Sequence, residues 1–122
     1  MHRRRILNSN GYEWAPSGEN VKKAVDNLPL SRGTVWIPYA PVADPLIIPE
    51  PIEVGDGLTI KGVNLFSSVL KMADGVDDSM FKYSEADDLM GFTLRDLWID
   101  GNKDNNTAGS GAELIPAGGV RS

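Results

Sequence analysis

The chain of 122 residues is long enough for one folded domain with a modest hydrophobic core. It contains no cysteine, which excludes a disulfide framework and any thiolate metal site. Its net charge of −5 disfavours a nucleic-acid partner, because binding phosphates needs a basic face, and no apolar run is long enough to cross a membrane.

Residues 1–16 are polar and basic, and we expect them to form a mobile lead-in. The cluster from His2 to Arg5 is not followed by the apolar segment of a signal peptide. Since His2 is the only histidine, a Ser-His-Asp triad would have to use this terminal residue.

A helix is predicted from Ser17 to Leu28. Its apolar residues recur every three or four positions, which is typical of one buried stripe. Ser17 is a suitable N-cap, and Pro29 ends the run. The stripe favours a helix that lies across the end of a β structure, with a partner-binding amphipathic helix as the alternative.

Short strands follow the helix. Thr34–Ile37 is rich in β-branched and aromatic residues, and Leu46–Ile48 and Ile52–Val54 lie within a proline-rich stretch. Proline cannot donate a hydrogen bond to a sheet, so this stretch is expected at edges and bends.

Further apolar runs then recur at short, nearly even intervals. They are Leu58–Gly62, Ser68–Met72, Ser79–Tyr83, Gly91–Leu94 and Leu97–Gly101. Asp-Gly pairs between them indicate turns. This repetition favours a β-solenoid, while a β-sandwich or jelly roll stays the alternative; only one helix is visible, which disfavours a doubly wound α/β fold.

The segment from Leu89 to Asn102 is the most informative part of the sequence. Its period-2 alternation changes phase after Arg95-Asp96, so a single flat strand would expose half of its apolar residues. We therefore predict a bend at Arg95-Asp96 between two short strands, and a second turn at Asp100-Gly101-Asn102.

The helix ENVKKAVDNLP, then GTVWIPYA, LTIKGVN and finally LWIDGN resemble in this order the N-terminal portion of the pectate-lyase-like superfamily. That superfamily of right-handed parallel β-helices includes polysaccharide lyases and phage tailspikes. We therefore predict an all-β fold for residues 17–104, a short right-handed parallel β-helix with one N-terminal capping α-helix. Residues 105–122 form a Gly/Ser-rich tail, which we expect to cap the fold or to contribute to an interface.

Carboxylates are the plausible reactive groups, because paired carboxylates can act as acid and base or bind Ca²⁺. The catalytic candidates are Asp77, Asp78, Asp87, Asp88 and Arg95. The resembling lyases use Asp-bound calcium with an Arg or Lys base, but their clusters lie on later coils that this chain lacks. We expect solvated turns at the Asp pairs and a salt-bridged or exposed corner at Arg95. We expect no cofactor and no metal, with Ca²⁺ only if the protein is a lyase.

Aromatic residues indicate contact surfaces. If the neighbours of Trp36 and Trp98 point inward, both indoles lie outside, as in sugar platforms and protein interfaces. The interface or glycan candidates are Trp36, Trp98, Tyr39, Leu114 and Ile115.

Three hypotheses follow. The first is a non-catalytic β-helix protein that assembles with copies of itself, and a trimer is the oligomer we expect first. Such a protein would be a virion, tailspike-like or surface component that contacts glycans. The second is a polysaccharide lyase or glycoside hydrolase that acts on acidic polysaccharide. The third is a fragment of a longer β-helix. We favour the first, which implies an extracellular or virion location.

Overall fold

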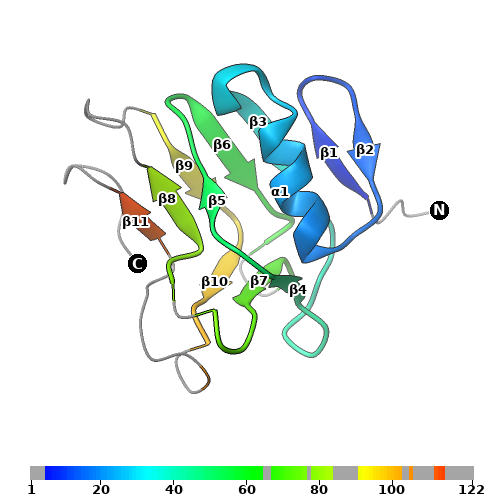
Figure 1. The fold of residues 1–122 in the computed structure, drawn as a ribbon. Helices are drawn as coiled ribbons and strands as arrows, with labels where there is room; N and C mark the ends of the chain where they lie inside the picture. The colour runs from blue at the N-terminus through cyan, green and yellow to red at the C-terminus, as the bar shows by residue number, and fades with distance from the viewer. Residues whose placement is uncertain are drawn as a thin grey trace.

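The computed structural model describes residues 5–64, 67–76, 78–83, 91–102, 105 and 112–114. Within these ranges the chain forms one α-helix, one 3₁₀ turn and eleven short strands (Figure 1). In chain order the elements are β1 (Ile6–Asn8), β2 (Glu13–Trp14), α1 (Gly18–Asp26), the 3₁₀ turn Pro29–Ser31, β3 (Gly33–Trp36), β4 (Leu46–Ile48), β5 (Ile52–Glu53), β6 (Leu58–Lys61), β7 (Val69–Met72), β8 (Phe81–Tyr83), β9 (Thr93–Arg95), β10 (Trp98–Asp100) and β11 (Ala112–Leu114).

The strands build three sheets. The first is a five-stranded mixed sheet in the order β2-β1-β3-β6-β9, and the other two are three-stranded, β10-β7-β4 and β11-β8-β5. The β1–β2 hairpin joins the first sheet by antiparallel pairing with β3. All other pairings between strands are parallel.

The predicted fold class is wrong. The strands of two to four residues form short sheets, one of them mixed, and these do not make a stacked right-handed parallel β-helix. The antiparallel hairpin lies in residues 1–16, which were expected to form a mobile lead-in. Ile6 and Asn8 of this segment are buried, so β1 is an integral strand of the first sheet.

The predicted bend at Arg95-Asp96 is confirmed. β9 ends at Arg95, and Asp96 adopts a left-handed backbone conformation with φ of 56° before β10 begins at Trp98. Phe92 and Leu97, on either side of the bend, are both buried. The change of phase in the sequence therefore marks the point where the chain leaves one sheet for another.

Residues that are aligned in register across neighbouring strands fill the core. Val35, Ile60 and Leu94 lie side by side across β3, β6 and β9 and point inward, as do Leu46 and Leu70 across β4 and β7. Aliphatic side chains from the three sheets thus share one hydrophobic cluster with the buried face of α1. Burial of this apolar surface is the main stabilising contribution.

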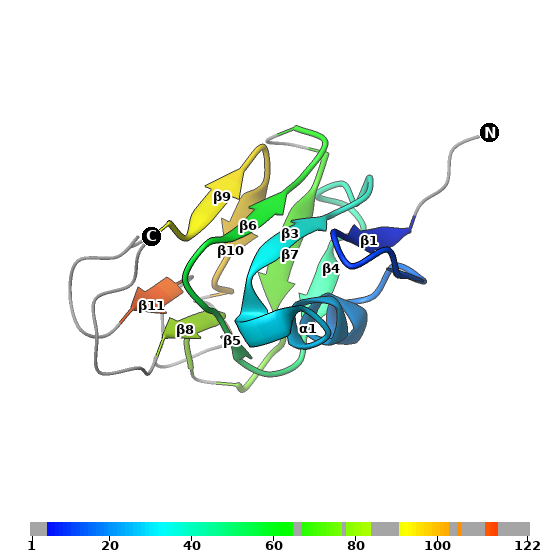
Figure 2. The same cartoon turned by 90° about the horizontal axis from the view of Figure 1, so that it is seen from above.

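Helix α1 lies over the β4 and β5 end of the core, beside the β1–β2 hairpin (Figures 1 and 2). The predicted N-cap is confirmed, since Ser17 Oγ accepts a hydrogen bond of 3.1 Å from the Asn20 N–H. Gly18 is buried in the first turn, where a Cβ atom would collide with the Ile47 backbone. Glycine at this position therefore lets the helix backbone approach β4 directly.

A buried asparagine fixes the hairpin to the helix. Asn8 Nδ2 donates to the Ala24 carbonyl and to Asn27 Oδ1, both at 3.0 Å. Its Oδ1 accepts from the N–H groups of Asn10 at 3.1 Å and Tyr12 at 3.3 Å. Since both ends of this amide are satisfied, Asn8 joins two elements that are not adjacent in sequence at little desolvation cost.

No helix in the described part of the chain is both long and apolar enough to cross a membrane.

Replacing Gly18 with Ala should lower the free energy of unfolding by about 1–3 kcal/mol, because the helix must move away from β4. Chemical denaturation measures the loss. Lys23→Ala, on the exposed side of the same helix, is the control and should change stability by less than about 0.5 kcal/mol. Equal stability of Gly18→Ala and the wild type would contradict the close packing.

Candidate functional site

The two ends of the sheets differ. At one end, α1 packs over β4 and β5, and β1 pairs with β3. At the other end, β9, β10 and β11 are the outermost strands of their sheets. Both cartoon views place these strands on the side away from α1 (Figures 1 and 2). We call β9, β10 and β11 the uncovered edge, because no described strand pairs with their outer sides.

The hydrogen bonds show which backbone groups the uncovered edge presents. The Arg95 carbonyl accepts from Gly62 N–H at 2.8 Å, and Trp98 N–H donates to the Ser68 carbonyl at 2.9 Å. These groups face β6 and β7. Successive residues of a parallel strand turn their backbone groups to alternate sides. The N–H and C=O of Leu94 and Ile99 therefore face away from their sheets.

The outer face of the five-stranded sheet carries a row of side chains in register. From β2 to β9 the register places Glu13, Leu7, Trp36, Lys61 and Arg95 opposite one another. We call these residues the outer row. A parallel row of hydroxyls from Thr34, Thr59 and Thr93 lies on the same face, two residues earlier in each strand.

Trp36 and Trp98 both point outward. Each is 41% exposed, whereas the neighbours Val35, Ile37 and Leu97 are buried. The alternation in the sequence correctly indicated this orientation. The two indoles lie on different sheets, so they do not form one continuous aromatic surface.

Trp98 lines a hollow of about 430 Å³ together with Lys71, Asp100, Asn102 and Asn105. Lys71 and Asp100 lie opposite each other in register. This arrangement of an aromatic ring beside polar side chains suits a sugar or a polar protein segment.

Asp100 and Asn102 have a structural role in that hollow. Asn102 has φ of 55° and is buried, as expected for the turn predicted there. Its Nδ2 donates to the Met72 carbonyl at 3.0 Å and to Asp74 Oδ1 at 2.6 Å. Its N–H donates to Asp100 Oδ1 at 2.8 Å, and its own Oδ1 accepts from Asn105 Nδ2 at 2.9 Å. Asn102 therefore holds the turn after β10 against the turn after β7.

A second hollow of about 440 Å³ lies where the first turn of α1 approaches the proline-rich loop. It is lined by the candidate residue Tyr39 and by Ile47, which are 45% and 46% exposed. These exposed apolar side chains indicate a contact surface.

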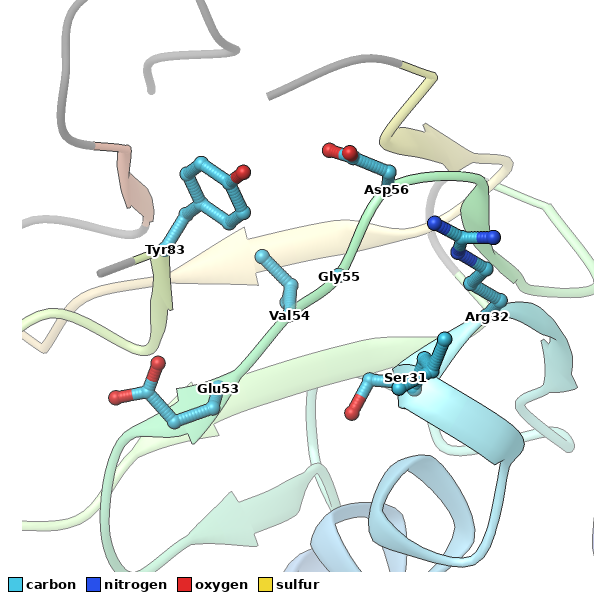
Figure 3. Close-up of a pocket in the computed structure, with 8 residues that line it drawn as sticks. Ser31, Arg32, Glu53, Val54, Gly55, Asp56 and Tyr83 are labelled. Carbon is cyan, nitrogen blue, oxygen red and sulfur yellow. The ribbon is translucent and has the colours of Figure 1, made fainter. Parts of the chain in front are cut away.

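A third hollow, of about 580 Å³, was not expected from the sequence. Figure 3 shows Tyr83 and Arg32 on opposite sides of the Val54–Gly55 segment, with the carboxylates of Asp56 and Glu53 beside it. It therefore combines one guanidinium, two carboxylates and a phenol.

The backbone beside this hollow is strained. Leu30 and Ser31 both have φ of 53°, and the Leu30 side chain is 78% exposed. A non-glycine residue in this conformation costs about 1–2 kcal/mol. Pro29 and Gly33 are turn-forming residues and could have indicated an irregular loop here. The hollow itself had no signal in the sequence, because the residues that line it come from segments far apart in the chain.

The catalytic candidates do not form a cluster in the described structure. Asp78 Oδ1 binds Lys82 Nζ at 2.8 Å and accepts from Ser79 N–H at 2.8 Å, whereas Arg95 lies in the outer row on β9. Asp77, Asp87 and Asp88 are outside the described residues.

Two interface candidates lie near the end of the sequence. Leu114 is the last residue of β11, and Ile115 lies outside the described residues.

Among the residues described, no group of three or more His, Asp or Glu side chains is placed to hold a metal ion. The sequence matches no family model, no curated protein and no solved structure. The resemblance to the pectate-lyase-like superfamily therefore stays a prediction.

The pKa of Asp78 is lowered from its ordinary value of 3.8, first by the hydrogen bond from Lys82 and then by the bond from Ser79 N–H. A lowered pKa in the folded state stabilises the fold at pH values above the unfolded pKa, and this contribution is lost as the pH falls through the folded pKa. Since the carboxylate is 38% exposed, the contribution is small.

Asp78→Asn should therefore lower the free energy of unfolding by less than about 1 kcal/mol at neutral pH, and the difference should vanish in acid. Urea denaturation across the pH range measures it. Asp44→Asn, at an exposed carboxylate that makes no ion pair with a described residue, is the control. A stability loss that persists below the lowered pKa would contradict this assignment.

Proposed function

We propose that the protein is a non-catalytic structural component that assembles with copies of itself through the uncovered edge. One observation carries the proposal: α1 and the hairpin cover one end of the three sheets, while β9, β10 and β11 are the outermost of the described strands at the other. Unpaired strand edges readily pair with another chain, and proteins that remain monomeric usually protect them.

The side chains at the uncovered edge support this proposal. Leu94 and Ile99 pack against the core but are only half-buried, so they keep apolar surface at the end of the sheets. Their backbone N–H and C=O groups face the same side. A partner strand would bury this apolar surface and satisfy these backbone groups in one contact.

The geometry favours two copies over the expected trimer. The edge is one patch at one end of the molecule, and the same patch on two copies can meet by two-fold symmetry. The trimer expectation rested on the resemblance to tailspikes. That resemblance is also the support for a virion or surface location and for contact with a glycan.

The alternative is a lyase or hydrolase that acts on acidic polysaccharide. Its support is the hollow of Figure 3, which places Glu53 and Asp56 near Arg32 and Tyr83. Paired carboxylates can divide acid and base roles in glycoside cleavage. Turnover of an acidic polysaccharide that disappears in Glu53→Gln and Asp56→Asn would favour this alternative.

A pair of matched double variants tests the proposal. Thr93→Lys with Trp98→Lys places two charges on the uncovered edge, where lysine discourages strand pairing. Thr34→Lys with Trp36→Lys makes the same replacements on β3, whose two edges pair with β1 and β6. Light scattering after size exclusion measures the mass of each variant over a wide dilution range.

We expect the wild type and the β3 variant to form a discrete oligomer and the edge variant to be monomeric. Thermal melting first establishes that both variants are folded. A wild type that is monomeric at every concentration, or an edge variant that keeps the wild-type mass, would contradict the proposal.

A further inference from the structure

Lys61 and Arg95 are like charges placed directly opposite each other on adjacent strands. Neighbouring strands lie about 4.8 Å apart, so the two side chains begin at nearly the same place on the outer face. Two like charges at this separation repel each other. The pair therefore has an electrostatic cost that a bound anion would remove.

The charges of this pair are not neutralised by the described residues. Four other basic residues of the described structure form ion pairs with carboxylates, namely Arg5, Lys22, Lys23 and Lys82. Neither Lys61 nor Arg95 has a described carboxylate within ion-pair distance. Arg32 and Lys71 also make no ion pair with a described carboxylate, but Lys61 and Arg95 differ from them in lying directly opposite each other, in a chain whose net charge is −5.

The surroundings of the pair indicate the rest of the ligand. Trp36 lies next to Lys61 in the outer row and is 41% exposed, so its indole offers apolar contact area with a polar edge. Thr59 lies two residues before Lys61 on the same face and adds a hydroxyl group that can donate a hydrogen bond. The face thus offers an aromatic platform at one end and an anion site at the other.

We propose that Trp36, Lys61 and Arg95 bind an acidic glycan, with a sugar ring against the indole and a carboxylate or sulfate between the two cations. Arginine accommodates such planar or tetrahedral anions through paired hydrogen bonds, and lysine adds a point charge. The negative charge of the protein as a whole disfavours nucleic acid, which needs a wide basic surface. This binding role is separate from self-assembly.

The experiment compares oligosaccharides of similar length by titration calorimetry at low salt. A sulfated oligosaccharide and an oligouronate are the acidic probes, a neutral glucan is the control, and a short single-stranded DNA tests for any polyanion. Lys61→Gln with Arg95→Gln removes the cation pair. Lys22→Gln with Lys23→Gln on α1 changes the net charge by the same amount and is the matched control.

We expect at least one acidic probe to bind and the neutral glucan not to bind. The cation-pair variant should lose about tenfold or more in affinity, Trp36→Ala should lose several-fold, and the α1 control should stay within about twofold. The probe that binds more tightly identifies whether sulfate or uronate is the natural anion.

Four outcomes would overturn the proposal: no binding of either acidic probe, equal binding of the neutral glucan, tighter binding of the DNA, or an equal loss in both double variants. The mass of each sample is measured in the same buffer. A monomeric protein that still binds the acidic probe would contradict the self-assembly proposal but support the glycan proposal. The experiment therefore tests the two proposals independently.

Discussion

The backbone groups at the strand edges are the constraint on which the rest of the structure depends. Three sheets of such short strands leave many N–H and C=O groups at their edges, and buried groups of this kind must be paired. At one end β1 pairs with β3, and α1 packs against β4 and β5, which it approaches closely only because residue 18 is glycine. The other end has no equivalent cover among the described residues, and this asymmetry is the basis of the proposed assembly.

One set of registers determines both the core and the outer surface. The pairing that aligns Val35 with Ile60 and Leu94 on the inner face also aligns Trp36 with Lys61 and Arg95 on the outer face. Because side chains alternate between faces, a shift of one residue would exchange these two sets. Burial of the aliphatic residues therefore holds the cations together despite their repulsion. Because the buried inner face provides the stability, the two cations on the outer face are available to bind a ligand.

The local structure was largely predictable from the sequence, whereas the pairing of strands was not. Periodicity indicated α1 and most strands, and the change of phase indicated the bend at Asp96. The β1–β2 hairpin was missed because its strands are very short and depend on Asn8, which binds a helix distant in sequence. The hollow at Arg32 and Tyr83 was missed for a similar reason, since its members meet only after the sheets have formed.

Amide hydrogen exchange at Leu94 and Ile99, measured at high and low protein concentration, tests the uncovered edge most directly. These N–H groups face away from their own sheets, so in a single copy they should exchange quickly. If copies pair through this edge, exchange at both residues should slow markedly at high concentration, while exchange in the central strand β6 should change little. Fast exchange at Leu94 and Ile99 at both concentrations would contradict the account.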